Sequence, residues 1–142
     1  MIWFSDYTPE KLNGLRNANM AGHIGIEFTE VGDDYLVATM PVDERTKQAF
    51  GILHGGASCV LSETLGSVAA WMTIDPTKQR AFGAEINANH LRPVSNGFVR
   101  GVCKPVTTGR TMQVWNTEIF NEEGKLTCVS RLTVIIKDAD KV

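Results

Sequence analysis

Glu63 is the only acidic or basic side chain, histidine aside, between Phe50 and Ile74. Burying a carboxylate costs free energy unless it is paired or hydrogen-bonded, and burial tends to raise its pKa. A protein that keeps an isolated acid in an apolar segment usually uses it, so Glu63 is the first candidate for a catalytic group. The alternative is that Glu63 faces solvent or pairs with an arginine elsewhere in the chain.

The tripeptide His54-Gly55-Gly56 stands just before this acid in the sequence. The first amides of a helix have no partner within the helix and lie at its positive end. Two glycines also let a ligand approach the backbone closely. The tripeptide therefore fits an oxyanion hole for a carbonyl group under attack. The alternative is a tight turn from a loop into a helix, which is the commoner use of a Gly-Gly pair taken alone.

Gly55 and Glu63 are too far apart to act on one carbonyl carbon within a single chain. Eight residues of helix separate them, which corresponds to about 12 Å along the helix axis. A two-fold axis could bring the helix start of one chain beside the helix middle of another, and cyclic dimers are the commonest oligomers. If both groups are catalytic, the sequence therefore predicts an active site at a dimer interface.

Apolar periodicity predicts one long helix that begins at these glycines and ends near Ile74. Its predicted apolar face consists of Ala57, Val60, Leu61, Thr64, Leu65, Val68 and Met72. The opposite side, with Ser58, Ser62, Gly66 and Ala69, carries almost no charge, so we expect burial on most sides. A short helix is predicted from Thr8 to about Ala18, and strands over 24–30, 35–42, 81–91, 98–104, 111–120 and 126–137.

Short turns between the last four strands predict antiparallel neighbours. The expected fold is therefore α+β, with a curved antiparallel sheet wrapped around a single long central helix. The length of 142 residues, with 43% hydrophobic residues, favours one globular domain over residues 1–142. The net charge of −2 is unlike that of a nucleic-acid binder or a polybasic membrane-surface protein.

The cysteines Cys59, Cys103 and Cys128 are scattered and form no CxxC pair. This spacing indicates neither a disulfide framework nor a zinc site, and no other cluster has metal-ligand spacing, so no metal is expected. The reducing cytoplasm is the expected compartment, because no signal peptide or membrane span is visible.

Several motifs together resemble the hotdog-fold acyl-CoA thioesterases. They are Gln48, the run Gly51-Ile52-Leu53-His54-Gly55-Gly56-Ala57, Glu63 and Gly66-Ser67. The resemblance extends over essentially the whole chain, including Met1-Ile2-Trp3, Met40-Pro41-Val42-Asp43, Asn87-Ala88-Asn89-His90 and Gly101-Val102-Cys103. In these runs the chain is similar to the small bacterial aryl-CoA thioesterases. The resemblance therefore implies a hotdog fold and hydrolysis of an aromatic acyl-CoA.

The resemblance also implies a role for each matching residue. Glu63 would attack the thioester or activate water, and Ser67 would hold Glu63 or that water. Gln48 and the Gly55 amide, from another subunit, would polarise the carbonyl, and His54 would help to orient the acyl end. The implied assembly is a homotetramer, a dimer of dimers with the active site at the dimer interface.

The residues that the resemblance implies for the ligand are Val68, Phe82, Asn89, His90, Leu91, Arg92, Val106, Thr107, Thr108, Gly109, Arg110 and Thr111. Arg92 and Arg110 are the cationic candidates for the phosphates of CoA, with a solvated surface as the alternative for each. CoA is part of the substrate, so no separate cofactor is expected.

With Val68 inside Gly66-Ser67-Val68-Ala69, the chain resembles the thioesterases of menaquinone synthesis more than those of siderophore proofreading. This resemblance implies 1,4-dihydroxy-2-naphthoyl-CoA as the acyl-CoA. Three other functions stay open at this point. One is proofreading of misloaded aryl or acyl carrier protein in siderophore synthesis. Another is a hotdog hydratase or dehydratase that acts on acyl thioesters. The last is a non-catalytic acyl-CoA sensor or carrier, which would need no acid in its pocket.

Overall fold

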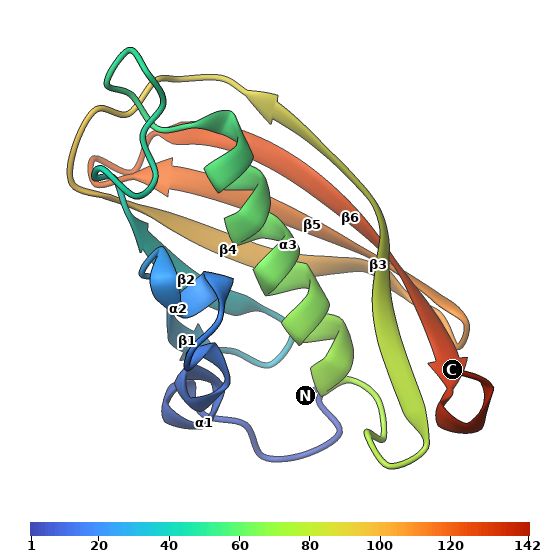
Figure 1. Cartoon of the computed structure of the whole chain (residues 1–142). Helices are drawn as coiled ribbons and strands as arrows, with labels where there is room; N and C mark the ends of the chain where they lie inside the picture. The colour runs from blue at the N-terminus through green and yellow to red at the C-terminus, as the bar shows by residue number, and fades with distance from the viewer.

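Six strands form one antiparallel sheet, and a long helix crosses one of its faces (Figure 1). The computed structural model describes the whole chain, residues 1–142. The helices are α1 (Pro9–Asn13), α2 (Met20–His23) and α3 (Gly55–Met72), with 3-10 turns at Gly14–Arg16 and Ala139–Lys141. The strands are β1 (Glu27–Val31), β2 (Leu36–Pro41), β3 (Gln79–His90), β4 (Phe98–Thr108), β5 (Met112–Asn121) and β6 (Leu126–Asp138). This arrangement confirms the predicted α+β hotdog fold.

The strand order across the sheet is β1-β2-β4-β5-β6-β3. β3 follows α3 in the chain but pairs only with β6, so it forms one edge of the sheet. Most of its twelve residues are exposed, and one side of its backbone has no strand partner. A long, unpaired edge strand is a template for pairing with another chain.

The N-terminal helix is shorter than the sequence predicts. Thr8 does cap it, because its hydroxyl accepts a hydrogen bond from the Lys11 amide, but α1 ends at Asn13. The Asn13 side chain exchanges two hydrogen bonds with the backbone of Phe28, at 2.9 and 2.8 Å. The chain continues as a 3-10 turn over Gly14–Arg16 and is extended at Asn17, so the prediction of one helix to Ala18 is wrong.

Two strand boundaries differ from the predicted ones by three residues or more. The first strand begins at Glu27 and not at Ile24, because Ile24 caps the end of α2. β4 continues to Thr108, beyond the predicted end at Lys104. A β-bulge between Pro105 and Thr107 lets the strand pass the proline, which lacks an amide donor.

α3 presents a different face to the sheet from the predicted one. Of the predicted stripe, Leu61, Leu65 and Met72 are fully buried. The other fully buried positions are the small residues Ser58, Ser62, Gly66, Ala69 and Ala70. Ala57, Val60, Thr64 and Val68 are only half-buried. Neither α3 nor any other helix of the chain is long and apolar enough to cross a membrane.

Close contact between α3 and the sheet explains this choice of face. A Cβ atom at Gly66 would lie 2.7 Å from Cδ2 of Leu132 on β6, and one at Gly101 on β4 would lie 2.7 Å from Cδ1 of Leu65. Small residues therefore let the helix backbone approach the strands, while the leucines fill the remaining space. The larger residues Val60 and Val68 pack partly against the core and remain half-buried along the side of the helix.

Candidate active site

The start of α3 carries one backbone amide without a partner. The Gly56 amide donates to Nδ1 of His54 at 2.8 Å. The amides of Ala57 and Ser58 donate to the His54 carbonyl at 3.0 and 3.3 Å. The amide of Gly55 donates to no protein atom. Because it lies at the positive end of the helix, it is free to donate to a developing negative charge on a ligand.

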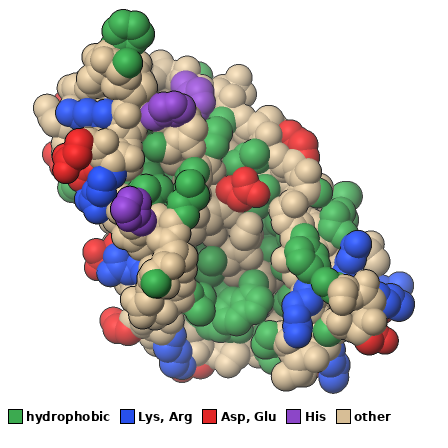
Figure 2. Space-filling view, in the orientation of Figure 1, with side chains coloured by type: hydrophobic (Ala, Val, Ile, Leu, Met, Phe, Trp, Pro, Cys, Tyr) green, Lys and Arg blue, Asp and Glu red, His purple; other side chains and the backbone are tan.

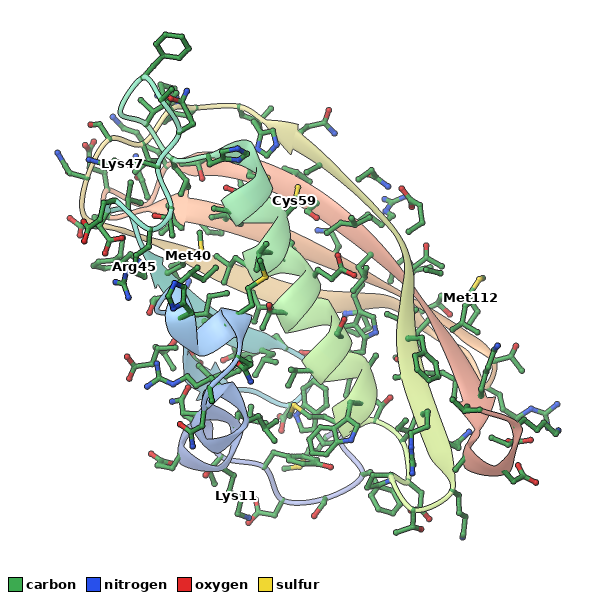
Figure 3. All side chains as sticks on the ribbon, viewed as in Figure 1. Lys11, Met40, Arg45, Lys47, Cys59 and Met112 are labelled. Carbon is green, nitrogen blue, oxygen red and sulfur yellow. The ribbon has the colours of Figure 1, made fainter.

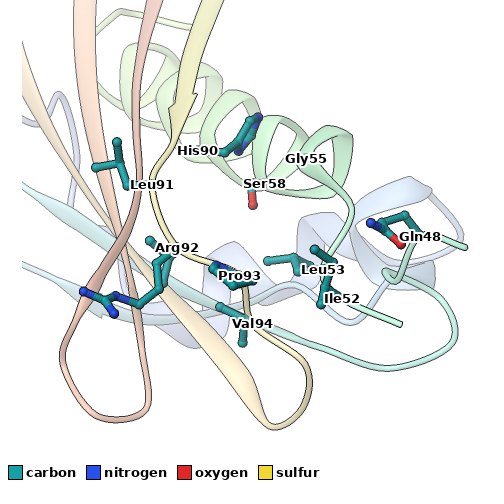
Figure 4. Close-up of a pocket in the computed structure, with 11 residues that line it drawn as sticks. Gln48, Ile52, Leu53, Gly55, Ser58, His90, Leu91, Arg92, Pro93 and Val94 are labelled. Carbon is teal, nitrogen blue, oxygen red and sulfur yellow. The ribbon is translucent and has the colours of Figure 1, made fainter. Parts of the chain in front are cut away.

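A cavity of about 360 Å³ opens beside this amide (Figure 4). Its lining residues are Gln48, Ile52, Leu53, Gly55, Ser58, His90, Leu91, Arg92, Pro93, Val94 and Thr127. They come from the loop before α3, the first turns of α3, the end of β3 with the segment that follows it, and the start of β6. Five of the residues predicted from the sequence thus come together here, namely Gln48, Gly55, His90, Leu91 and Arg92.

In the loop before α3, the side-chain nitrogen Nε2 of Gln48 makes no hydrogen bond, whereas its backbone does. The Gln48 main chain donates to the carbonyl of Ile52 at 2.9 Å and accepts from the amide of Gly51 at 3.1 Å. Its side-chain oxygen accepts from the amide of Phe50. Gly51 has φ +84°, the left-handed region, which suits a glycine in this tight turn. With its oxygen occupied, the Gln48 side chain can offer Nε2 as a donor.

His90 packs directly against the helix start. A Cβ atom at Gly55 would lie 2.8 Å from Nε2 of the His90 ring, so no larger residue fits at Gly55 without a shift. His54 is exposed and uses its Nδ1 to cap the helix. Gly55 therefore allows both the turn into the helix and the close approach of the His90 ring, while the oxyanion-hole role stays a prediction.

Glu63 lies two turns along α3, outside this cavity. Figure 2 shows one acidic group over the middle of α3, set among hydrophobic and uncharged atoms, and Glu63 is the only acidic residue of that helix. Its side chain is exposed in the single chain and makes no hydrogen bond or ion pair, including none with Ser67. Its Oε1 lies against β3, 2.7 Å from where a Cβ atom of Gly83 would stand.

Cys59 lies one helical turn before Glu63 on α3 (Figure 3). Burial raises the pKa of the Cys59 thiol, and the nearby Glu63 carboxylate adds to the rise. A thiol with a raised pKa is a poor nucleophile at neutral pH. Cys59 is therefore a poor candidate for a nucleophile in this region.

The turn 106–111 lies at the opposite end of α3, whereas Asn89 adjoins His90 at the first cavity and Val68 lies on α3 itself. Arg110 lines a second cavity of about 200 Å³ with Thr73, which follows the last residue of α3, and with Gln79 at the start of β3. Phe82 stands in one cross-strand row with Ile135 and Met112, and this row is on the sheet face away from α3 because Val134 and Ile136 face the core. An 18-residue helix is about 27 Å long, so Arg92 and Arg110 do not meet within one chain.

Sequence reasoning missed several residues of the site. The cavity-lining residues that it did not single out are Ser58, Pro93, Val94 and Thr127. It also missed Gly83, which lies beneath Glu63. An isolated glycine in a strand pattern signals a bulge or a close backbone approach, so Gly83 could have been found from the sequence. The proline and valine carried no such signal.

The chain is similar in sequence to known proteins. The model of the thioesterase superfamily matches residues 50–128. The chain is 54% identical to the 1,4-dihydroxy-2-naphthoyl-CoA hydrolase of Escherichia coli, over 96% of this chain and 99% of that protein. It is 50% identical to the proofreading thioesterase EntH of Cronobacter turicensis, over 96% of this chain and 98% of that protein.

The fold is also similar to that of solved thioesterase structures. A mutant of the thioesterase PA1618 from Pseudomonas aeruginosa superimposes with a TM-score of 0.96 and 39% identity, covering 97% of this chain and 99% of that chain. The thioesterase HI1161 from Haemophilus influenzae superimposes with a TM-score of 0.94 and 46% identity, covering 97% of this chain and 96% of that chain.

Proposed function

This chain belongs to the thioesterase superfamily and is a thioester hydrolase, and we propose that it hydrolyses an aromatic acyl-CoA to the free acid and CoA. We propose 1,4-dihydroxy-2-naphthoyl-CoA as the natural substrate, supported by the likeness to the Escherichia coli hydrolase. The half-buried residues Val60 and Val68 leave an apolar strip beside Glu63, which suits a flat aromatic acyl group.

The free Gly55 amide is the observation that carries the proposed chemistry. It opens into a cavity that Gln48 also lines, so two N–H donors can converge on one thioester oxygen. Such donors stabilise the negative charge that develops on this oxygen when the carbonyl carbon is attacked. His54 holds the neighbouring amide of Gly56 and so keeps the helix start in place.

In this proposal Glu63 acts in one of two ways. It attacks the thioester carbonyl carbon itself, or it takes a proton from the water that attacks this carbon. In the second case the water oxygen bonds to the carbonyl carbon, the carbon–sulfur bond breaks, and the CoA thiolate leaves and takes up a proton. Ser67, one turn after Glu63, makes no hydrogen bond with the carboxylate in the single chain, so in this proposal it holds the attacking water. Nothing else in the middle of α3 is charged, so no neighbouring cation competes for the carboxylate.

Two chains are needed to complete this site. Gly55 and Glu63 are about 12 Å apart along one helix axis, whereas both must reach the same carbonyl group. The unpaired β3 edge supports a dimer in which two β3 strands pair antiparallel and extend the sheet. In that dimer, Gln48 and Gly55 of one chain act with Glu63 and Ser67 of the other.

Two contacts with β3 define how the copies would align. Glu63 lies over Gly83 and Gly55 lies against His90, so Gly83 would stand opposite the partner's His90. The bulge between Gly83 and Glu85 takes up one residue of β3. The midpoint of the pairing then falls at Asn87, which would face its own copy at the two-fold axis.

A cysteine at Asn87 is therefore expected to link two chains. Oxidation of Asn87→Cys should give a disulfide-bonded dimer on a non-reducing gel, because directly opposed residues of an antiparallel pair lie within disulfide reach. Asn17→Cys is the matched control, since Asn17 is also exposed but lies far along the chain from β3. Equal dimer formation by both variants, or by neither, would contradict the alignment.

We further propose that two such dimers associate into a tetramer. Phe82 and Met112, 42% and 47% exposed, form with Ile135 an apolar row on the sheet face away from α3, which supports a second interface there. Light scattering of the parent protein should give a mass of four copies.

The antiparallel dimer also bears on the CoA end of the substrate. The end of β3 that carries Asn89, His90, Leu91 and Arg92 would lie beside the partner's β3 start, near which the turn 106–111 is found. Arg92 from one chain and Arg110 from the other could then both reach the phosphates of one CoA.

The three cysteines are free, which supports the cytoplasm as the compartment.

A thiol-release panel tests the proposed substrate. We expect kcat/KM to be highest for the naphthoyl ester, lower for benzoyl-CoA and lowest for aliphatic CoA esters of similar length. The likeness to EntH makes an aryl thioester of a carrier protein the second candidate, so it belongs in the same panel. Faster hydrolysis of the carrier-protein thioester than of every CoA ester would replace our assignment by proofreading. Preference for an aliphatic ester would contradict the aromatic acyl group.

A further inference from the structure

The Glu63 carboxylate rests on a strand residue that has no side chain. A Cβ atom at Gly83 would lie 2.7 Å from Oε1 and 3.7 Å from Cδ of Glu63. Contacts below 3.0 Å essentially never occur for a real Cβ atom, so any side chain at Gly83 would displace this oxygen. The same Cβ would be 3.6 Å from Cδ1 of Leu132, which is an ordinary contact. The carboxylate is thus the only group that a methyl group here would disturb.

The backbone itself does not require glycine at this position. The glycines with positive φ are Gly25, Gly51, Gly97 and Gly124, and Gly83 is not among them. Glycine inside a strand costs conformational entropy and packs no side chain, so it weakens the strand. Gly83 also adjoins the one irregularity of β3, the bulge before Glu85. Both features are typical of a place where another group approaches the backbone closely.

Nothing else in the chain holds the carboxylate of Glu63. It takes part in none of the ion pairs, and no side chain or amide donates to it. A glutamate side chain with three rotatable bonds would otherwise spread over several rotamers. Because Gly83 has no side chain, the Glu63 carboxylate can approach the backbone of β3. The contact with Gly83 therefore determines the distance between the carboxylate and this strand.

We propose that Gly83 is a positioning residue for Glu63. Its missing side chain lets the carboxylate settle against the bulged edge of β3, on the side where a second chain would present its Gly55. The inference rests on the catalytic role proposed above for Glu63. Gly83 itself touches no reacting atom and acts only through the place that it leaves for the carboxylate.

Gly83→Ala tests this role in the full-length protein. We expect kcat to fall about tenfold with KM unchanged, because misplacement of a reacting group by about 1 Å slows the chemical step without weakening binding. The melting temperature should stay at the parental value, because the displaced atom is the far end of a flexible side chain. Gly14→Ala is the matched control, since no atom lies within 4 Å of a Cβ there.

A double-mutant cycle with Glu63→Gln separates positioning from a structural role. If Gly83 acts through the carboxylate, adding Gly83→Ala to Glu63→Gln should leave the residual rate unchanged. An equal loss in both backgrounds, or loss of the parental oligomeric state by Gly83→Ala, would overturn the proposal. Parental kcat in Gly83→Ala alongside an inactive Glu63→Gln would also overturn it while leaving the proposed function intact. Parental activity in Glu63→Gln would instead remove the proposed function.

Discussion

Glu63→Gln should reduce kcat by about 10³-fold, the scale of effect typical when a general base is removed. Glutamine keeps the size and shape of the side chain but can neither attack the thioester nor accept a proton from water. Because Glu63 is exposed and makes no hydrogen bond in the chain, the substitution breaks no folding contact. The steady-state rate of thiol release gives the measurement, with circular dichroism and gel filtration to verify the fold and the assembly.

Glu118→Gln is the matched control for that experiment. Glu118 is an exposed glutamate on β5, and its neighbours Thr117 and Ile119 face the core, so its own side chain points away from α3. This variant should keep the parental kcat. A Glu63→Gln enzyme that turns over at the parental rate would show that the isolated acid of α3 has no part in the reaction.

Gln48→Ala should reduce kcat by about 10²-fold, the usual effect of removing one donor from an oxyanion hole. The loss should appear in kcat, with KM little changed, because the donor strengthens its hydrogen bond as charge develops on the thioester oxygen. The Gly55 amide remains in this variant, so the residual rate should stay above that of Glu63→Gln. The two rate constants are obtained from initial rates over a range of acyl-CoA concentrations.

Lys47→Ala is the control within the same loop. The main chain of Lys47 bridges to Leu53, and an alanine there leaves that bridge in place. The Lys47 side chain does not line the cavity, so kcat should not change. If Gln48→Ala raises KM and leaves kcat at the parental value, Gln48 binds the substrate but does not stabilise the transition state.

The elements that follow from local sequence were predicted well. α3 begins at the predicted glycine and ends two residues before Ile74, because a dense apolar periodicity and an Asp-Pro break mark its limits. The last three strands begin within one residue of their predicted starts, because turn residues bound them. Where a distant contact competes, as between Asn13 and Phe28, the local pattern was wrong.

The sequence by itself predicted the candidate chemical groups and, if both are catalytic, a site that needs two chains. An isolated acid, a glycine-marked helix start and the helical rise between them are all properties of spacing along the chain. Only the tertiary structure decided which face of α3 is buried, that β3 is an edge, and that Gly83 lies beneath Glu63. Apolar periodicity shows that a helix has two different faces. Which face is buried depends on how its side chains pack against strands that are distant in the sequence.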